Sequence, residues 1–273
     1  KYRPRRVIGF GGRTGFLLML FSCVLFIPSA IYEPNAVYGK ANRVLSLFVR
    51  RVFLGLRLKT RTREVEVGVP VREEVIAVAD DQAQVRRELG LSPDGKTVLV
   101  FGGSSGAHAV NMLVREMVAR YADGSTEMVS LKGTQFIHIT GSADKAVMES
   151  AYAAAGMPAR VFEYYSDMGR LYRAADVIVC RSGASTVAEV AFVRKPAMLI
   201  PYPYASYHQT DNALVLRGAS GIVILEQQGL TSEVLVQSIQ TLSAGRSDKD
   251  TIPVRSLWTP PQDFARKIVD TMI

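Results

Sequence analysis

Residues 96–110, KTVLVFGGSSGAHAV, decide the fold class because they join a buried strand to a helix through a glycine-rich turn. The run 97–101 is apolar and rich in β-branched residues, which favours a strand that is covered on both faces. The glycines after it permit a tight turn, and the apolar spacing that follows fits an amphipathic helix over 107–121. A strand that passes directly into a helix is the first half of a βαβ unit.

The same alternation continues along most of the chain. We expect strands at 97–101, 135–140, 160–162, 176–180, 197–200 and 222–225, and helices at 107–121, 143–155, 185–193, 208–216 and 232–242. Strands separated by single helices need crossover connections, so the sheet is expected to be parallel and covered on both faces. The pattern predicts an α/β, Rossmann-like domain.

The first quarter of the chain repeats part of this pattern. We expect a strand at 7–8, a helix over 16–26, a strand at 29–32, a helix over 39–48, and a last strand with the interdomain connection within 57–72. Because the chain opens almost directly on a strand and starts with Lys, we expect a first domain without its upstream elements. Pro260 and Pro261 separate a final amphipathic helix. The expected units are 1–68, 69–255 and a C-terminal helix at 256–273.

Composition and charge restrict the function. Of 273 residues, 48% are hydrophobic and 21% are charged, which is typical of a globular chain and excludes disordered and coiled-coil classes. Residues 1–72 hold 14 Lys and Arg against three Asp and Glu, whereas 73–273 hold 19 against 22, so the positive charge lies in the first quarter. Such a surface attracts nucleic acid, anionic lipid or phosphorylated substrates. No nucleic-acid-binding motif accompanies it, so no nucleic-acid partner is expected.

The cysteines and the apolar runs exclude other classes. Cys23 and Cys180 are far apart in sequence, which argues against a secreted disulfide scaffold and against a zinc site. The longest apolar run, 16–28, is shorter than the ~20 residues of a membrane span. Basic residues before it imitate a signal peptide, but glycines intervene and no cleavage site is clear. We expect a helix that is buried or that touches a membrane surface.

The glycine turn at 102–106 is a candidate anion site. Unpaired N–H groups at a helix start attract a diphosphate, and Ser104 adds a hydroxyl donor. The G-G-x-x-G spacing is neither the dinucleotide fingerprint nor a P-loop. Taken alone, the turn could equally be a tight connection without a ligand.

A second loop supports the interpretation of the glycine turn as part of a ligand site. Residues 181–186, RSGAST, again follow a strand, and Glu189 lies further along the next helix. Ligands of open α/β sheets bind outside the carboxyl ends of the strands, where both loops are expected. A carboxylate there can accept hydrogen bonds from ribose hydroxyls; the alternative is that Glu189 only complements the helix dipole.

The third loop, 201–212, carries His208, Gln209 and Asn212. Amides and an imidazole offer donors and acceptors that can bind several sugar hydroxyls. A structural histidine and ordinary helix-start residues are the alternative.

At these three places the sequence resembles the MurG family of glycosyltransferases. The resemblance is carried by GGSSGA at 102–107, DMGRLYRAADVIVCRSGASTVAE at 167–189 and HQTDNA at 208–213. The amino-terminal part agrees through GFGG at 9–12, EPNA at 33–36 and GVPVR at 68–72. The motifs occur in the family's order along nearly the whole chain. The resemblance implies two Rossmann-like domains facing each other across a cleft, the glycosyltransferase B arrangement, with an incomplete first domain and a last helix that returns to it.

The resemblance also implies the roles of individual residues. It assigns the donor diphosphate to the turn around Gly103 and Ser104, the ribose to Glu189, and the uracil to the backbone near Tyr165. The same comparison places close to the nucleotide the residues Arg72, Met168, Ala184, Ser185 and Thr186. His208 and Gln209 match positions that bind the sugar hydroxyls, and Asn35 lies on the acceptor side of the cleft.

The chain departs from the family pattern at several positions. Tyr32 stands where the family often has His, Pro34 replaces Gln, Val69 replaces Asn, and residues 13–15 shorten the second glycine loop. The first glycine loop, with a histidine proposed to help activate the acceptor, has no counterpart. Glu33 is then the acidic candidate for the catalytic base near the cleft, and a structural hydrogen-bonding role is its alternative.

The implied reaction moves N-acetylglucosamine from UDP-N-acetylglucosamine to the muramyl sugar of undecaprenyl-pyrophosphoryl-muramyl-pentapeptide. No cofactor or metal is expected. A basic, apolar first domain suits anionic lipids at the cytoplasmic face of the plasma membrane, with Phe16, Leu17, Leu20, Phe21 and Val24 as the apolar contact. The alternatives are a transferase acting on diacylglycerol, a sugar-nucleotide epimerase, and a non-catalytic UDP-sugar-binding chain.

Overall fold

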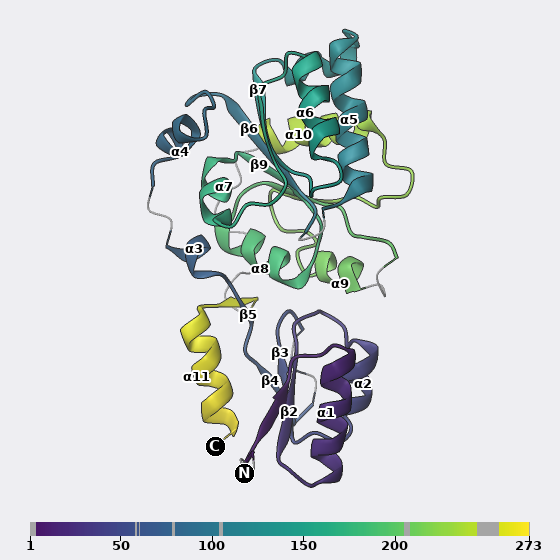
Figure 1. Cartoon of the computed structure of the whole chain (residues 1–273), viewed down its shortest axis with the longest axis vertical. Coiled ribbons are helices and arrows are strands. Elements are labelled where there is room, and N and C mark those ends of the chain that lie inside the picture. Colours follow the sequence, from purple (N-terminus) through teal and green to yellow (C-terminus); the bar gives the residue numbers. More distant parts are fainter. Residues whose placement is uncertain are drawn as a thin grey trace.

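The computed structural model describes residues 4–57, 59, 61–77, 80–103, 106–204, 208–244 and 257–272. These residues form two parallel sheets, one above the other in Figure 1. The prediction of two parallel α/β units is confirmed.

The first sheet has the spatial order β1 (Val7–Gly9), β2 (Ser29–Glu33), β3 (Arg51–Leu54) and β4 (Glu64–Glu66). One face packs against α1 (Arg13–Val24) and α2 (Lys40–Leu45) through buried residues such as Met19 and Leu45. The other face packs against α11 (Pro261–Met272), which lies on the opposite side of the sheet from α1 (Figure 1). Thus the end of the chain returns to its first quarter.

The second sheet has the order β11 (Ile222–Ile224), β10 (Ala197–Leu199), β9 (Val177–Cys180), β6 (Lys96–Phe101), β7 (Thr134–Ile139) and β8 (Ala159–Phe162). One face is covered by α5 (His108–Ala122), η1 (Thr126–Leu131), α6 (Lys145–Ala154) and α10 (Ser232–Ala244). The other face is covered by α3 (Glu73–Ile76), α4 (Gln82–Glu88), α7 (Met168–Ala174), α8 (Ala184–Val193) and α9 (His208–Leu214). A small pair, β5 (Val69–Pro70) with β12 (Trp258–Thr259), lies between the two sheets.

Several elements differ from the sequence expectation. Helix α1 begins at Arg13 rather than at 16, and Gly12 before it has φ 83°, a backbone conformation that glycine adopts readily. Strand β3 and helix α7 were not expected, because β3 follows the α2 turn closely and α7 is only seven residues long. Short buried segments carry too few periods to be recognised.

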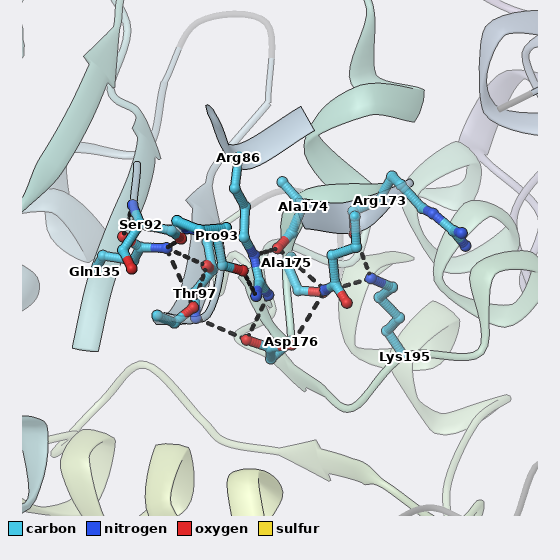
Figure 2. Close-up of polar contacts among 12 residues, drawn as sticks. Arg86, Ser92, Pro93, Thr97, Gln135, Arg173, Ala174, Ala175, Asp176 and Lys195 are labelled. Atoms are coloured by element: carbon cyan, nitrogen blue, oxygen red, sulfur yellow. Dashed lines mark hydrogen bonds and ion pairs between the residues drawn. The ribbon is translucent and has the colours of Figure 1, made fainter. Parts of the chain in front are cut away.

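The amino-terminal edge of the second sheet is held by a polar cluster (Figure 2). Arg86 donates to Asp176 Oδ2 at 2.7 Å, and the same oxygen accepts from the Thr97 N–H at 2.8 Å. Lys195 Nζ donates to the carbonyl oxygens of Arg173, at 2.8 Å, and Ala175, where α7 ends. These bonds satisfy carbonyl groups that a helix end leaves without partners.

Because of Lys195, we expect the free energy of unfolding to depend on pH in the alkaline range. Burial lowers the pKa of Lys195 to about 8, from an ordinary value of 10.5. Between these values the folded chain binds fewer protons than the unfolded chain, so the free energy of unfolding should rise with pH by about 2 kcal/mol. Urea unfolding from pH 7.5 to 10.5 should give a free energy of unfolding that rises more, or falls less, with pH in the wild type than in Lys195→Met, because both proteins share the opposing titration of buried Cys180. Equal pH slopes for the two proteins would contradict it.

Candidate active site

The two domains meet through Asn212, a fully buried residue of α9. Its Oδ1 accepts from the Ala36 N–H at 2.9 Å, and its Nδ2 donates to Asn35 Oδ1 at 3.0 Å. The same Nδ2 lies 3.2 Å from the carbonyl oxygen of Ser182, which follows β9. One amide therefore joins the loop after β2 to the loop after β9, so the carboxyl ends of these strands face each other.

Glu189 lies on the second-domain side of this junction and is 3% exposed. Its Oε1 accepts from Arg72 Nε at 2.8 Å, and its Oε2 accepts from Arg72 Nη2 at 3.0 Å and from the Tyr172 hydroxyl at 2.9 Å. Burial alone would lower the pKa of Arg72, but the hydrogen bond and charge of Glu189 outweigh it and raise that pKa. Burial, with the nearby Glu189, raises the pKa of Tyr172 well above 10. Two hydrogen bonds thus join Glu189 to Arg72 of the interdomain connection.

Other residues that the sequence resemblance selected lie in the second domain, three of them at the start of α8. Ala184, Ser185 and Thr186 form its first turn, directly after Gly183. Met168 is buried and Tyr165 half-buried, and both pack against the same core as α8. Gly103 is exposed at the end of β6, while Ser104 lies outside the described residues.

The glycine turn at 102–106 lies close to the end of β7 as well as to the start of α5. A Cβ on Gly106 would lie 2.2 Å from the Thr140 carbonyl oxygen, and its φ is +76°. Only glycine fits such an approach with such a dihedral angle. This end of the turn is therefore fixed against the loop after β7.

His208 and Gln209 begin α9, which belongs to the second domain like α8. Gln209 Oε1 accepts from the Tyr202 N–H at 3.0 Å and the Ser182 N–H at 3.3 Å, which fixes its side chain beside the loop after β9. His208 is half-buried, and its Nδ1 has no hydrogen-bond partner among the described residues. Its Nε2 would be 3.9 Å from a Cβ placed on Gly39 of the first domain. Both side chains therefore lie at the domain junction.

Glu33, the acidic candidate for the catalytic base, lines a cavity in the first domain and is held by four hydrogen-bond donors. It is 1% exposed. Its Oε1 accepts from the N–H and Nδ2 of Asn35 at 3.1 and 2.9 Å, and its Oε2 accepts from the Gly39 N–H and Asn42 Nδ2, each at 2.9 Å. Four donors occupy the lone-pair directions of one carboxylate. Glu33 fixes the loop that presents Asn35 to Asn212.

A cavity of about 830 Å³ opens beside this loop in the first domain. Asn35, Lys40 and Asn42 supply polar groups, and the apolar lining includes Phe10, Phe16, Leu17 and Val44. Asn42 is 4% exposed, and its Oδ1 has no hydrogen-bond partner among the described residues. A buried acceptor without a donor favours binding of a hydroxyl or N–H group. Asn42 was not among the predicted site residues because a lone asparagine in a helix carries no motif.

Known proteins are similar to this chain in sequence and in architecture. Residues 97–255 match the glycosyltransferase family 28 C-terminal domain. The UDP-N-acetylglucosamine--N-acetylmuramyl-(pentapeptide) pyrophosphoryl-undecaprenol N-acetylglucosamine transferase of Desulfotalea psychrophila is 34% identical over 274 residues, covering 98% of this chain and 71% of that protein. The chain belongs to the MurG family. The enzyme of that name from Syntrophus aciditrophicus is 37% identical over 245 residues, covering 88% of this chain and 64% of its own length.

A solved MurG structure has the same fold. The crystal structure of Acinetobacter baumannii MurG aligns with a TM-score of 0.76 at 27% identity, covering 98% of this chain and 73% of that one. As in the MurG family generally, the arrangement is that of a glycosyltransferase. Within the described residues, no helix has both the length and the hydropathy of a membrane span.

Proposed function

We propose that this chain is a hexosyltransferase that moves N-acetylglucosamine from UDP-N-acetylglucosamine to the 4-hydroxyl of the muramyl sugar of a pyrophosphoryl-undecaprenol acceptor, converting lipid I to lipid II. The names of its relatives support this substrate pair. The observation that carries the proposal is the junction at Asn212, which joins a donor loop and an acceptor loop from different domains.

The donor site uses the carboxyl edge of the second sheet. Glu189 binds the ribose hydroxyls, and the backbone near Tyr165, with Met168, borders the uracil. The turn at Gly103 and Ser104 and the first turn of α8 bind the diphosphate through N–H groups and hydroxyls. Both Glu189 oxygens already have partners, so the ribose must share the carboxylate with Arg72 or displace it.

The acceptor binds in the cavity beside Asn35 and Asn42. Its 4-hydroxyl gives its proton to Glu33, which lines this cavity and exchanges one of its present donors for the acceptor. The 4-oxygen attacks the anomeric carbon, the bond from that carbon to the β-phosphate oxygen breaks, and UDP leaves with the electron pair, inverting the configuration. Negative charge grows on the diphosphate, so N–H groups held at the helix starts stabilise the transition state more than the bound substrate. His208 and Gln209 hold the sugar between the two domains.

A membrane-bound acceptor requires a membrane-facing surface on the first domain. The outward face of α1 exposes Leu17, Leu18, Phe21 and Val24, by 56 to 65% each. Exposed apolar groups on a basic domain are typical of a peripheral protein that binds anionic lipid. We place this face on the cytoplasmic leaflet, where the acceptor is reached.

The α1 face should contribute measurably to membrane binding. Leu17→Ser with Phe21→Ser should reduce flotation with acidic liposomes roughly tenfold, because two apolar side chains no longer enter the lipid. Val269→Ser is a matched control, since Val269 is 54% exposed on α11 across the sheet. Equal flotation of all three proteins would argue against this contact.

A transfer assay tests the whole proposal. Radiolabelled UDP-N-acetylglucosamine is incubated with a detergent-soluble lipid I analogue, with diacylglycerol, and without an acceptor. Label should appear only on the lipid I analogue. Label on diacylglycerol, or release of free sugar without an acceptor, would assign a different reaction. UDP binding without transfer to either acceptor would assign a binding role alone.

A further inference from the structure

A second cavity, of about 670 Å³, lies in the second domain beside α9 and the outermost strand, β11. Its lining includes Thr210 and Leu214 of α9 and Ile222 and Ile224 of β11. Asn212 is two residues from both Thr210 and Leu214, so the 3.6-residue helical period directs it to the opposite face of α9. The cavity is therefore distinct from the domain junction, although the same helix borders both.

The cavity continues the row of proposed donor contacts along the carboxyl edge of the sheet. Tyr165 follows β8, Gly103 follows β6 and Ser182 follows β9, in the spatial order of these strands. Gln209, after β10, accepts from the Ser182 N–H, and Thr210 beside it lines the cavity. Uracil, diphosphate and transferred sugar thus take successive positions in the proposed donor site, and the cavity comes next, beyond the sugar.

A buried arginine connects the cavity wall to the loop after β9. Arg181 is 5% exposed, and its Nη1 donates to the carbonyl oxygens of Ile200 and Pro201 at 3.0 and 3.3 Å. Its Nη2 donates to Gln227 Oε1, and both Pro201 and Gln227 line the cavity. The cavity wall is therefore held in a fixed position relative to the sugar-binding residues.

Strand β11 offers free backbone groups along one side of the cavity. It is the last strand in the order of the sheet and pairs with β10 alone among the described strands. The Ala197 N–H donates to Gly221 O, and the Leu225 N–H donates to Leu199 O. Alternate residues of β11 therefore face β10, and the N–H and C=O groups of Ile224 point away from it. A free strand edge of this kind pairs with an extended peptide.

The charged groups of the cavity also suit a peptide. Arg217, shortly after α9, and Glu226, after β11, are both exposed. Within the described residues neither of them has an ion pair or a side-chain hydrogen bond. Their opposite charges leave the described lining without net charge, which disfavours a small anion such as inorganic phosphate. A peptide brings N–H and C=O groups for the strand edge and a single carboxylate for Arg217.

We propose that this cavity binds the peptide of the muramyl acceptor, with the peptide paired along the edge of β11 and its C-terminal carboxylate on Arg217. The names of the relatives give their acceptor a pentapeptide. Such a peptide is joined to the muramyl lactyl group through its amino end, so its C-terminal carboxylate is free. This inference rests on the proposed function and assigns it a specificity site.

The length of the peptide fits this placement. The lactyl group is attached to the carbon next to the one that bears the 4-hydroxyl, so the peptide begins close to the reacting oxygen. Five extended residues span about 17 Å, whereas a helix with its side chains is about 11 Å wide. The peptide therefore reaches from the domain junction past the start of α9 to the edge of β11.

Transfer kinetics with three acceptors test the site. Detergent-soluble lipid I analogues carry the pentapeptide, the pentapeptide with a C-terminal amide, or no peptide. In the wild type the amide should raise the acceptor KM about fivefold and leave kcat unchanged, since one exposed ion pair is lost. Arg217→Gln should raise the KM for the pentapeptide acceptor by a similar factor. In that variant the amide should have no further effect, and the KM for the peptide-free acceptor should equal that of the wild type.

A matched variant and a direct measurement accompany the kinetics. Arg115→Gln removes the same charge from an exposed position of α5, on the other face of the sheet, and should change none of the three KM values. A photoreactive group at the C-terminus of the peptide should attach to residues within 217–228. Thermal unfolding checks that each variant is folded.

The outcomes separate this inference from the proposed function. Transfer to all three acceptors with equal KM values, or an unchanged KM in Arg217→Gln, would overturn the peptide site alone. Equal losses in Arg115→Gln and Arg217→Gln would show a general effect of charge and would also overturn it, as would crosslinks confined to the first domain. No transfer by the wild type to any of the three acceptors would refute the proposed function and this inference with it.

Discussion

Glu189→Ala should weaken UDP binding roughly 100-fold, because a buried carboxylate that accepts ribose hydroxyls contributes two charge-assisted hydrogen bonds. Isothermal titration should show a similar loss for uridine, which carries the ribose without phosphates. Binding of inorganic pyrophosphate should change little, since its contacts lie at the glycine turn and at the start of α8.

Two controls separate the ribose contact from a structural effect. Tyr172→Phe removes one of the three hydrogen bonds to Glu189 and should change UDP affinity less than tenfold. In Glu189→Ala, Arg72 loses the carboxylate to which it donates two hydrogen bonds. Thermal unfolding measures whether the domain stays folded after this loss. Unchanged uridine affinity in a folded Glu189→Ala protein would remove Glu189 from the donor site.

Acid should destabilise the second domain by about 3 kcal/mol through His138, which is fully buried in β7. Its Nε2 lies 3.0 Å from Asn111 Oδ1, and Asn111 Nδ2 donates to Thr140 O and Asp144 Oδ2. The Asn111 oxygen can only accept, so His138 carries its proton on Nε2 and accepts at Nδ1 from Tyr152. The imidazole is neutral and has no place for a second proton.

The sign of the pH effect follows from the two protonation states. Burial lowers the pKa of His138 to about 3, whereas the unfolded chain keeps the ordinary 6.5. Between these values the unfolded chain binds more protons, so stability is lost as pH falls below 6.5. Urea unfolding at pH 7.5, 6, 5 and 4 measures the slope.

His138→Gln is the matched variant because an amide can donate to Asn111 and accept from Tyr152. It should be less stable than the wild type at pH 7.5 but should lose less stability on acidification. Tyr152→Phe keeps the imidazole and should keep the acid slope. The same slope in His138→Gln as in the wild type would assign acid sensitivity to other groups.

The network also explains how the glycine turn is held. Asn111 Nδ2 donates to the Thr140 carbonyl oxygen, against which Gly106 packs. Asp144 Oδ1 forms a hydrogen bond with His108 Nδ1 at 2.9 Å. Hydrogen bonds to Asn111 and His108 lower the pKa of Asp144, although its burial acts in the opposite direction. Polar groups behind the turn therefore fix its far side, independently of any ligand.

Much of the second domain was predictable because its signals are local. A β-branched run such as Val98–Val100, followed by glycines and then a 3.6-residue period, specifies strand, turn and helix from neighbouring residues alone. Parallel pairing followed from the single helices between strands. In the first domain, β3 gave no such signal, since four residues after a short helix show no period.

The candidate site was only partly predictable. Motifs selected Glu189, Asn35, His208 and Gln209, and the structure places the last three at the domain junction. Tyr172, the partner of Glu189, carried no functional signal in the sequence. Asn212, the partner of Asn35, had an equally good structural alternative. Arg72 and Glu189 are 117 residues apart, and no spacing in the sequence reveals a contact of that kind.

The amino-acid order alone determined the parallel α/β class, the glycine turns and the basic first quarter, because each depends on neighbouring side chains or on their sum. Tertiary structure decided which groups meet: it satisfied Glu33 with four donors, left Asn42 Oδ1 without one among the described residues, and gathered arginines from two strand starts. Hydrogen bonding and charge act over a few ångströms, so their partners are fixed only once the chain has folded.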